Sequence, residues 1–268
     1  MARRKNTFPL HIERMIAAIY AAALRRLAKR VMAGFKRSYH SDSARFDESF
    51  REYLARMMNE DPDIMTNKFI QYKIERAEMA LRFYAFRTVS DSMTAIKNLK
   101  KRDFAKLAIE QAVDSPFIME IKENFIKTNM EMLDLAGKEY ISGISEAAMN
   151  TFLNGGSMDD LVETMTEYTD GDVARAEFWA QDQMSSAYSE YTGQLHKEAG
   201  LDNYVWRTSG DNAVREAHRE LEGKTFSWAT GAPMQDDCGG GLYNPGTPYR
   251  CRCTAEPTLD EPDEGGVE

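Results

Sequence analysis

Glycine and proline are rare over the first two thirds of this 268-residue chain and become frequent only after Gly200. Both residues disfavour the interior of a helix, so their scarcity favours helical structure over most of the chain. Between the few breaks, apolar residues recur at spacings of three and four, which places them on one face of a helix. The sequence therefore predicts a mainly α fold, in which an elongated helical body of roughly 200 residues precedes a small C-terminal α+β module.

The predicted helices end where proline, glycine or serine interrupts the apolar pattern. Pro116 begins a long helix that ends at Gly155, and Gly200 ends the last helix. Ser157 and Asp160 resemble a capping box, with Asp in place of the usual Glu, and are expected to open a short helix. The helices predicted from these signals cover residues 12–31, 43–59, 63–98, 101–113, 116–154, 157–166 and 172–199.

The residues after Gly200 have the mixed character of an α+β module. β-branched and aromatic residues predict three strands, and Asp211 is expected to cap one short helix. The strands are predicted at 204–208, 225–228 and 249–255, the helix at 212–221, and a glycine- and proline-rich loop at 231–248.

Charge divides the chain further. Residues 1–40 contain ten basic residues and one acidic residue, a net charge of +9, so the remaining 228 residues carry −18 of the total of −9. Such a segment is expected either to bind a polyanion or acidic protein face, or to be a solvated helix face, and both readings stay open. The expected organisation is a basic helical arm (1–40), a helical body (41–200), the α+β module (201–258) and an acidic disordered tail (259–268).

The basic arm is also the part of the chain that suggests contact with nucleic acid. Any binding of DNA is expected to be unspecific, because the sequence contains no base-reading motif. The candidate DNA-binding residues are Arg25, Arg26, Lys29, Arg30, Lys36 and Arg37.

One apolar stretch in the arm, residues 15–24, is a candidate export signal. Charged residues flank it closely on both sides and the helical pattern continues beyond it, which favours an ordinary helix. No run reaches the ~20 apolar residues that a membrane span needs. We therefore expect no membrane span and a soluble, intracellular protein.

All three cysteines lie in the C-terminal module, at Cys238, Cys251 and Cys253. On the predicted strand, positions 251 and 253 point the same way, so that their thiolates could share one ion, with His218 and Cys238 as further ligands. Three thiolates and one imidazole form a common tetrahedral zinc site, which would staple a module with little core. Buried thiols without an ion are the main alternative, and a disulfide the next.

The predicted helix in the module also suggests acid–base chemistry, because Asp211, Arg215 and His218 follow one another at spacings of four and three. A structural role is the stronger interpretation: the Asp caps the helix, the Arg pairs with it, and the His packs or binds a metal. The chain contains no Walker loop, G-x-S-x-G or H-E-x-x-H motif. We therefore expect no catalytic residues and no enzyme.

The module resembles the phage Mu F-like head morphogenesis family. The resemblance extends over about residues 172–257, and only the helical character of the chain is similar upstream. Its structural motif includes Trp206, Asp211, Arg215 and Gly223. The similar segments are Tyr204-Val205-Trp206-Arg207-Thr208-Ser209-Gly210-Asp211, Val214-Arg215, His218, Leu221, Gly223-Lys224, Phe226, Asn244-Pro245-Gly246, Tyr249-Arg250-Cys251-Arg252-Cys253 and Ala255-Glu256-Pro257.

The resemblance implies a minor head protein that associates with the portal, takes part in procapsid assembly, and in some members affects DNA packaging or delivery. It implies a location in the virion, in the head interior near the portal, and in the host cytoplasm during assembly. The implied partners are the portal protein and the major capsid or scaffolding protein. The alternatives are a nuclease- or toxin-like enzyme module, and a regulatory zinc protein, for which no helix-turn-helix signal is present.

The chain departs from the family pattern at two positions. Members often have His-Pro-Gly where this chain has Asn244-Pro245-Gly246, so any ligand supplied by that histidine is lost here. The helix before the module often reads A-R-[DT]-[QE] in the family, and here it reads Ala180-Gln181-Asp182-Gln183. A role for the family's arginine at this position is therefore not expected.

Overall fold

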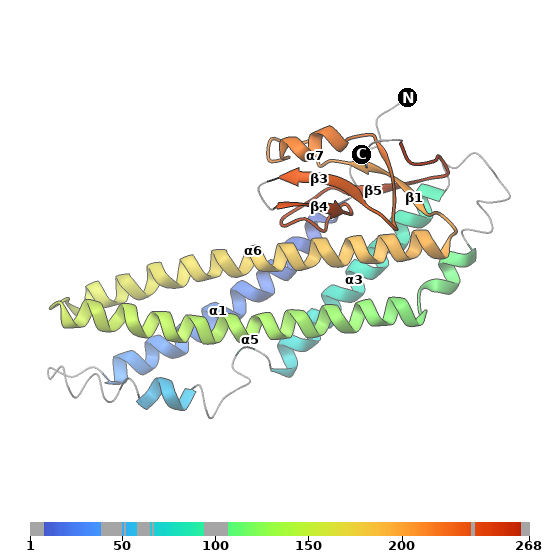
Figure 1. The fold of residues 1–268 in the computed structure, drawn as a ribbon. Coiled ribbons are helices and arrows are strands. Elements are labelled where there is room, and N and C mark those ends of the chain that lie inside the picture. Colours follow the sequence, from blue (N-terminus) through green and yellow to red (C-terminus); the bar gives the residue numbers. More distant parts are fainter. Residues whose placement is uncertain are drawn as a thin grey trace. The chain divides into compact units, whose positions relative to one another are not determined.

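The structure is a computed structural model that describes residues 8–38, 50, 52–57, 65, 67–93, 107–236 and 239–263 (Figure 1). The described residues are mainly α-helical, as predicted, with a small strand module after residue 200. None of the described helices is both long and apolar enough to cross a lipid bilayer. The long helices are α1 (Leu10–Ser38), α3 (Lys68–Met93), α5 (Pro116–Leu153) and α6 (Met158–Glu198).

Local capping explains where two of these helices begin. Asn67 Oδ1 accepts hydrogen bonds of 3.1 Å from the backbone of residues 69 and 70, so α3 begins at Lys68 and not at the predicted residue 63. Before α6, Ser157 and Asp160 form the predicted capping box: Asp160 Oδ2 accepts from Ser157 N at 2.6 Å, and Ser157 Oγ accepts from Asp160 N at 3.2 Å. The helix predicted over 116–154 is confirmed as α5.

The break predicted between residues 166 and 172 is wrong, because α6 runs without interruption from Met158 to Glu198. Gly171 lies within it, with open space where a side chain would be. Two threonines in this stretch bond to carbonyls of their own helix, and so do not compete with it: Thr166 Oγ1 donates to Val162 O at 2.7 Å and Thr169 Oγ1 to Met165 O at 2.6 Å.

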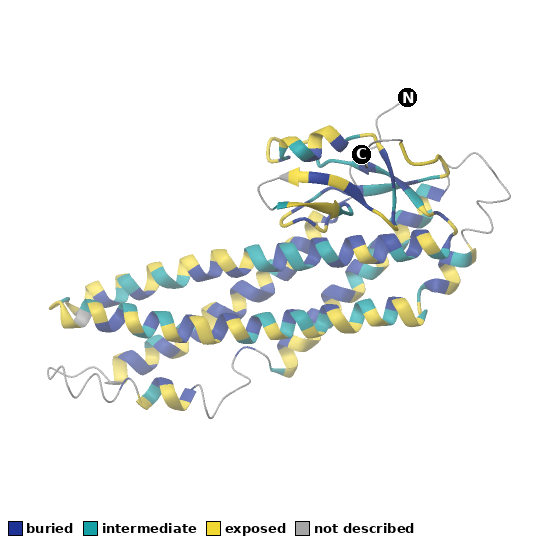
Figure 2. Cartoon of the chain, viewed as in Figure 1, coloured by how far each residue is buried: buried dark blue, intermediate teal, exposed yellow. Residues whose placement is uncertain are grey.

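The chain divides into two compact units, and neither coincides with a single predicted segment. The second unit comprises residues 14–76 and 126–180. Inside it, Tyr20 donates from its hydroxyl to Asn129 Oδ1 at 3.0 Å, and Tyr140 shares a 2.9 Å hydrogen bond with Thr169. Buried and exposed residues alternate along the helices with helical spacing (Figure 2).

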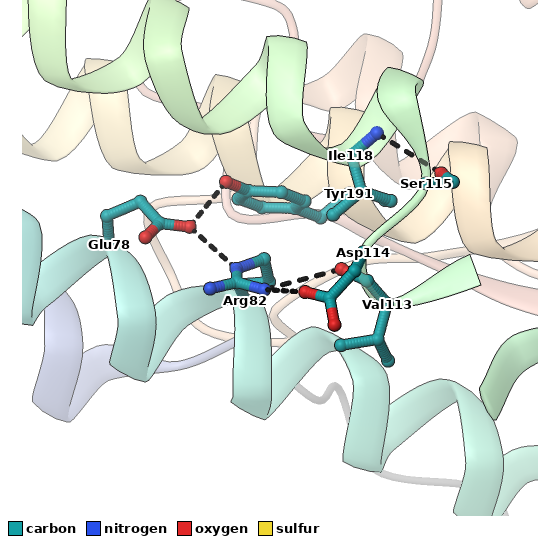
Figure 3. Close-up of polar contacts among 7 residues, drawn as sticks. All are labelled: Glu78, Arg82, Val113, Asp114, Ser115, Ile118 and Tyr191. Atoms are coloured by element: carbon teal, nitrogen blue, oxygen red, sulfur yellow. Dashed lines mark hydrogen bonds and ion pairs between the residues drawn. The ribbon is translucent and has the colours of Figure 1, made fainter. Parts of the chain in front are cut away.

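The first unit comprises residues 1–13, 77–125 and 181–268. Figure 3 shows a polar network in its core, in which the carboxylate of Glu78 accepts from Tyr191 Oη at 2.7 Å and from Arg82 Nε at 3.0 Å. Arg82 also donates to Val113 O at 3.3 Å. Glu78 and Tyr191 are fully buried, so each depends on the other for its hydrogen bonding. Burial is also the main reason why the pKa of Tyr191 is raised.

The strand module lies in the first unit and contains two small sheets. In one, β1 (Asn203–Arg207) is the central strand and pairs antiparallel with β2 (Thr225–Ser227) and β5 (Thr254–Thr258). Trp206 lies opposite Ala255, and Tyr204 opposite Phe226. Tyr204 and Trp206 are fully buried and alternate with partly exposed neighbours, as a strand with one buried face requires.

Three predictions for the module are corrected. The segment 231–248 is not a loop throughout: it contains the hairpin of β3 (Ala232–Asp236) and β4 (Gly239–Tyr243), which its glycines and proline concealed. The last strand spans 254–258 and not 249–255. The helix α7 (Glu216–Leu221) begins at residue 216 and not at 212.

Other predictions fall partly outside the described residues. Within the helices predicted at 43–59 and 101–113, residues 50, 52–57 and 107–113 are described, and all of them except Val113 are helical. The tail predicted to be disordered is ordered as far as Asp263, which exchanges backbone and side-chain hydrogen bonds with Thr225 at 3.0 and 2.6 Å. Residues 264–268 lie outside the description.

Candidate metal centre

Cys251 and Cys253 lie in the core of the strand module. Both are buried and neither forms a disulfide. They pack in one cluster with aromatic side chains from the first sheet. The cluster contains Tyr204, Trp206, Leu221, Phe226, Trp228, Ala232, Met234, Cys251 and Cys253.

The structure brings His218 to the two cysteines, as predicted. His218 Nδ1 lies 3.4 Å from Cys253 Sγ and 3.5 Å from Cys251 Sγ, and the three ligand atoms all lie within 4.8 Å of one another. The three residues could therefore hold a metal ion. Cys238, the fourth predicted ligand, lies outside the described residues.

The two cysteines converge by a turn and not by the predicted strand geometry. Cys251 N donates to Pro248 O at 2.9 Å, and Arg250 adopts a left-handed backbone conformation with φ of 56°. This turn changes the direction of the chain just before β5. Both sulfurs therefore face His218 of α7. The expectation that the side chains would meet is confirmed, while the strand that was invoked to explain it is wrong.

The two thiols differ in their affinity for protons. Burial alone would raise the pKa of Cys251, but hydrogen bonds from Cys253 and His218 outweigh burial and lower this pKa to about 5. The hydrogen bond to Cys251, together with burial, raises the pKa of Cys253. These contacts therefore favour the thiolate form of Cys251 and the thiol form of Cys253.

The backbone also supports negative charge on Cys251. Its sulfur accepts from the amides of Gly246 and Cys253, both at 3.4 Å. Donors of this kind stabilise a thiolate, which is the form of cysteine that binds metals. Gly246 can approach this closely only without a side chain, because a Cβ there would lie 3.0 Å from Ser185 O.

The distances from the histidine nitrogen to the two sulfurs fit a tetrahedral ion. With bonds of about 2.3 Å to sulfur and about 2.0 Å to nitrogen, two such ligands are about 3.5 Å apart at a tetrahedral angle. The distances from His218 Nδ1 to the two sulfurs, 3.4 and 3.5 Å, agree with this value. They also suit hydrogen bonds between an N–H group and sulfur, so buried thiols without an ion fit the same geometry.

The other end of the His218 ring meets a cation. Arg215 NH1 lies 3.0 Å from His218 Nε2, and Arg215 NH2 donates to Tyr249 O. Arg215 is the N-cap residue of α7, in an extended conformation, and makes no side-chain cap. The prediction that Asp211 caps this helix is wrong: its carboxylate accepts from Ala213 N at 3.0 Å, in a turn that precedes α7.

A pocket of about 210 Å³ opens beside these groups. Arg215, Arg250 and Arg252 line it together with the carboxylate of Asp211, and the triad lies at one side. Asp211, Arg215 and His218 thus share a cavity, although they do not share a helix face. Within this set, His218 itself is only 3% exposed.

The remaining residues of the sequence motif have structural roles. Trp206 packs edge-on against His218, with ring centroids 5.9 Å apart. Gly223 donates its N–H to Trp206 O at 2.9 Å and has φ of 82°, so it ends α7 and joins it to β1. Arg207 donates to Glu256 at 2.7 Å, which joins β1 to β5.

Several residues that hold the cysteine turn were not predicted from the sequence. Asp182 Oδ1 accepts from Arg250 N at 2.9 Å, and Glu13 accepts from Arg252 NH2 at 3.0 Å. With its amide oxygen facing the guanidinium, Gln181 accepts from Arg252 Nε and NH2, both at 3.0 Å. The contact at Gln181 could have been suspected from the sequence, because the family often has arginine at this position. An arginine there would face the guanidinium of Arg252, whereas glutamine supplies a hydrogen-bond acceptor.

Asn244, which replaces a histidine common in the family, is not among the three residues that could hold a metal. Its Oδ1 accepts from the hydroxyl of Tyr204 at 3.1 Å, and its carbonyl accepts from Thr247. The side chain thus anchors the turn that carries Gly246 toward Cys251.

The six predicted DNA-binding residues lie on α1, within the second unit, and all are exposed. Tyr53 donates to the Arg30 carbonyl at 2.8 Å, and its ring lies 5.4 Å from the Arg37 guanidinium. Exposure suits both open readings, a polyanion-binding face and a solvated face.

Comparison with known proteins agrees with this picture. A protein of Haemophilus influenzae, described only as an uncharacterized protein, is 29% identical over 151 residues, which make up 56% of this chain and 32% of that protein. No solved structure matches the chain significantly. The family model described as "Phage Mu protein F like protein" matches residues 142–256, beginning earlier than the resemblance noted in the sequence and including His218, Cys251 and Cys253. Residues 142–256 of this chain are therefore similar to the phage Mu protein F like family.

Proposed function

We propose that this chain is a minor head protein of a tailed phage, which associates with the portal and acts during procapsid assembly. The match of residues 142–256 to the phage Mu F-like family carries the proposal. The protein would bind other virion proteins, namely the portal protein and the major capsid or scaffolding protein. It would reside in the host cytoplasm during assembly and then in the head interior near the portal.

Association with the portal is testable with purified proteins. The full chain would be co-expressed with the portal protein and, separately, with the major capsid protein of the same phage. Elution with the portal in size-exclusion chromatography supports the proposal. Elution with the capsid protein alone would support a role in the head but contradict association with the portal. Elution with neither protein would contradict both parts of the proposal.

We propose further that the protein acts by binding and not by catalysis. His218 is only 3% exposed, and both of its ring nitrogens have close partners, which favours a structural role over proton transfer to a substrate. The alternative, a nuclease- or toxin-like module, has one observation in its favour: Asp211, Arg215 and His218 share a pocket. Cleavage of DNA by the purified chain, lost in His218→Ala, would support that alternative.

The metal we propose for the triad is zinc, held by His218, Cys251 and Cys253, with Cys238 as the fourth ligand predicted from the sequence. Zinc favours tetrahedral sites of thiolate and imidazole, and the ion would act as a staple of the module core. Elemental analysis is expected to find one zinc ion per chain. Cys251→Ser and Cys253→Ser should lose it, and Cys238→Ser tests the fourth ligand. Absence of zinc, with melting unchanged after chelation, would leave the thiols as core residues.

Unspecific DNA contact by the basic arm forms the last part of the proposal. Neutralising six phosphate-binding side chains should lower the slope of log K against log salt by up to about 5, at about 0.9 for each contact. The test variant replaces Arg25, Arg26, Lys29, Arg30, Lys36 and Arg37 with Gln. A charge-matched control variant replaces six exposed basic residues elsewhere with Gln: Lys68, Arg76, Arg87, Lys127, Lys138 and Arg219. If the two variants retained DNA equally, the basic arm would be a solvated helix face and not a DNA-binding segment.

A further inference from the structure

We infer that Arg215 opposes metal binding at the triad by fixing His218 in the tautomer that carries its proton on Nδ1. The inference rests on the proposed metal site and concerns how the occupancy of that site is controlled. Arg215 would be a positioning residue, which acts on the ion through the imidazole without touching the ion.

The contact between the two side chains determines the tautomer. A guanidinium has five N–H donors and no acceptor, so at 3.0 Å from Arg215 NH1 the Nε2 atom of His218 must be the acceptor. A neutral imidazole has one N–H and one acceptor nitrogen. The hydrogen of His218 therefore lies on Nδ1, where it points at the sulfurs of Cys251 and Cys253, 3.5 and 3.4 Å away.

Metal binding requires the opposite tautomer. An ion held between the two sulfurs takes the lone pair of Nδ1, so the proton of Nδ1 passes through solvent to Nε2. The new Nε2–H group would then face Arg215 NH1, with two donors 3.0 Å apart and no acceptor between them. Metal-binding histidines usually donate their second N–H to a carboxylate, a carbonyl or water. Arg215 offers none of these.

The two states therefore exclude each other: either Arg215 donates to His218, or an ion occupies Nδ1 and Arg215 has moved. The pocket beside the triad gives the guanidinium space to move into. Asp211, whose carboxylate lines the same pocket, is an acceptor that it could meet there. Occupancy of the metal site would thus change the position of a positive charge in this pocket.

A matched pair of substitutions tests the inference. Arg215→Lys keeps a cationic side chain that can only donate, whereas Arg215→Gln offers an amide oxygen that can accept from Nε2–H directly or through water. Both variants lose the bond from Arg215 NH2 to Tyr249 O, so this loss cancels in the comparison. Affinity would be measured with Co²⁺, whose thiolate charge-transfer absorption reports binding, and with Zn²⁺ in competition.

We expect Arg215→Gln to bind Co²⁺ about tenfold more tightly than Arg215→Lys, the scale on which outer-shell hydrogen bonds act. Equal affinities of the two variants would overturn the inference and leave the metal site intact. If the wild type and both variants fail to bind either ion, the metal site itself is rejected.

The tautomer can be measured in the wild type, so the inference does not depend on how the variants fold. The chain has only four histidines, and a His218→Gln spectrum identifies the signals of His218 in a long-range ¹H–¹⁵N correlation. In the metal-free protein, Nδ1 should give the shift of a protonated nitrogen and Nε2 that of an unprotonated one. Protonated Nε2, alone or in an imidazolium, would overturn the inference whatever the ion affinities.

Discussion

The indole of Trp228 donates a 3.1 Å hydrogen bond from Nε1 to Nδ1 of His196, inside the first unit. His196 lies near the end of α6 and is fully buried, and its Nε2 has no hydrogen-bond partner among the described residues. Burial lowers the pKa of His196 from 6.5 to about 3, so the ring is neutral in the folded protein near neutral pH. Because Nδ1 accepts, the proton of the neutral ring lies on Nε2.

This histidine should make the fold sensitive to acid. Its folded pKa of about 3 lies below the value of 6.5 expected when unfolded, so the unfolded chain binds the proton more readily. The stabilising contribution is complete above pH 6.5 and is lost as the pH falls from there toward 3. The free energy of unfolding should fall by up to about 1.4 kcal/mol per pH unit in this window. Urea titrations at several pH values measure it.

The control is His196→Gln, which keeps an acceptor for Trp228 but has no titratable group. Carboxylates and the other histidines titrate in both proteins, so only the difference between wild type and variant reports His196. This difference should shrink as the pH is lowered from 6.5 to 4. Parallel curves for the two proteins would contradict the assignment.

Tyr191→Phe should destabilise the first unit by about 1–3 kcal/mol, because it leaves the fully buried Glu78 carboxylate without one of its donors. Tyr72→Phe is the control, since this tyrosine is half exposed and should cost less than about 0.5 kcal/mol. Chemical denaturation measures both. A double-mutant cycle with Glu78→Leu, which removes the acceptor, should show coupling, and additive effects would mean that the bond of Figure 3 contributes nothing.

Gly246→Ala should cost clearly more than Gly155→Ala. Both glycines have positive φ, 90° and 80°, so alanine is strained at each by about 1 kcal/mol. At Gly155 nothing lies within 4 Å of the added Cβ, whereas at Gly246 it meets Ser185 O at 3.0 Å and Ser189 Cβ at 3.2 Å. The alanine at 246 should also disturb the amide that donates to Cys251, and so weaken Co²⁺ binding. If the two substitutions lowered the thermal stability equally, Gly246 would have no special role in holding the site together.

Glu13→Gln should destabilise the first unit by about 1–3 kcal/mol, because Glu13 and Arg252 form a two-bond ion pair whose side chains are only 11% and 30% exposed. The matched control is Glu216→Gln, which breaks the exposed pair with Arg219 and should change stability by less than about 0.5 kcal/mol. Guanidinium denaturation compares the two. Similar small effects would show that the Arg252 pair behaves as a surface contact.

Sequence reasoning was most successful where the signal is local. The start of α5 after Ser115 and the capping box at Ser157 depend on neighbouring residues, and both were predicted. The break near Gly171 was predicted from propensity, but the threonine hydroxyls of α6 bond within the helix and leave it continuous. The hairpin of β3 and β4 was missed because its glycines and Pro233 have low strand propensity.

The sequence predicted the ligands of the candidate metal centre, but it did not predict the residues that hold these ligands in place. His218, Cys251 and Cys253 could be grouped because imidazole and thiolates share a chemistry. Arg215 was expected to pair with Asp211 through helix spacing, and the turn that precedes α7 placed its guanidinium on His218 instead. Glu13 lies more than two hundred residues from Arg252, and no periodicity or motif connects positions so distant.

The ion pair between Glu13 and Arg252 also orders events in time. During synthesis on a ribosome, α1 emerges long before the cysteine turn. Glu13 can therefore pair with Arg252 only after almost the whole chain has been made. The second unit, which ends at residue 180, is free to fold meanwhile. The pair in the first unit can form only after Arg252 has been made, so a chain that stops before this residue lacks it.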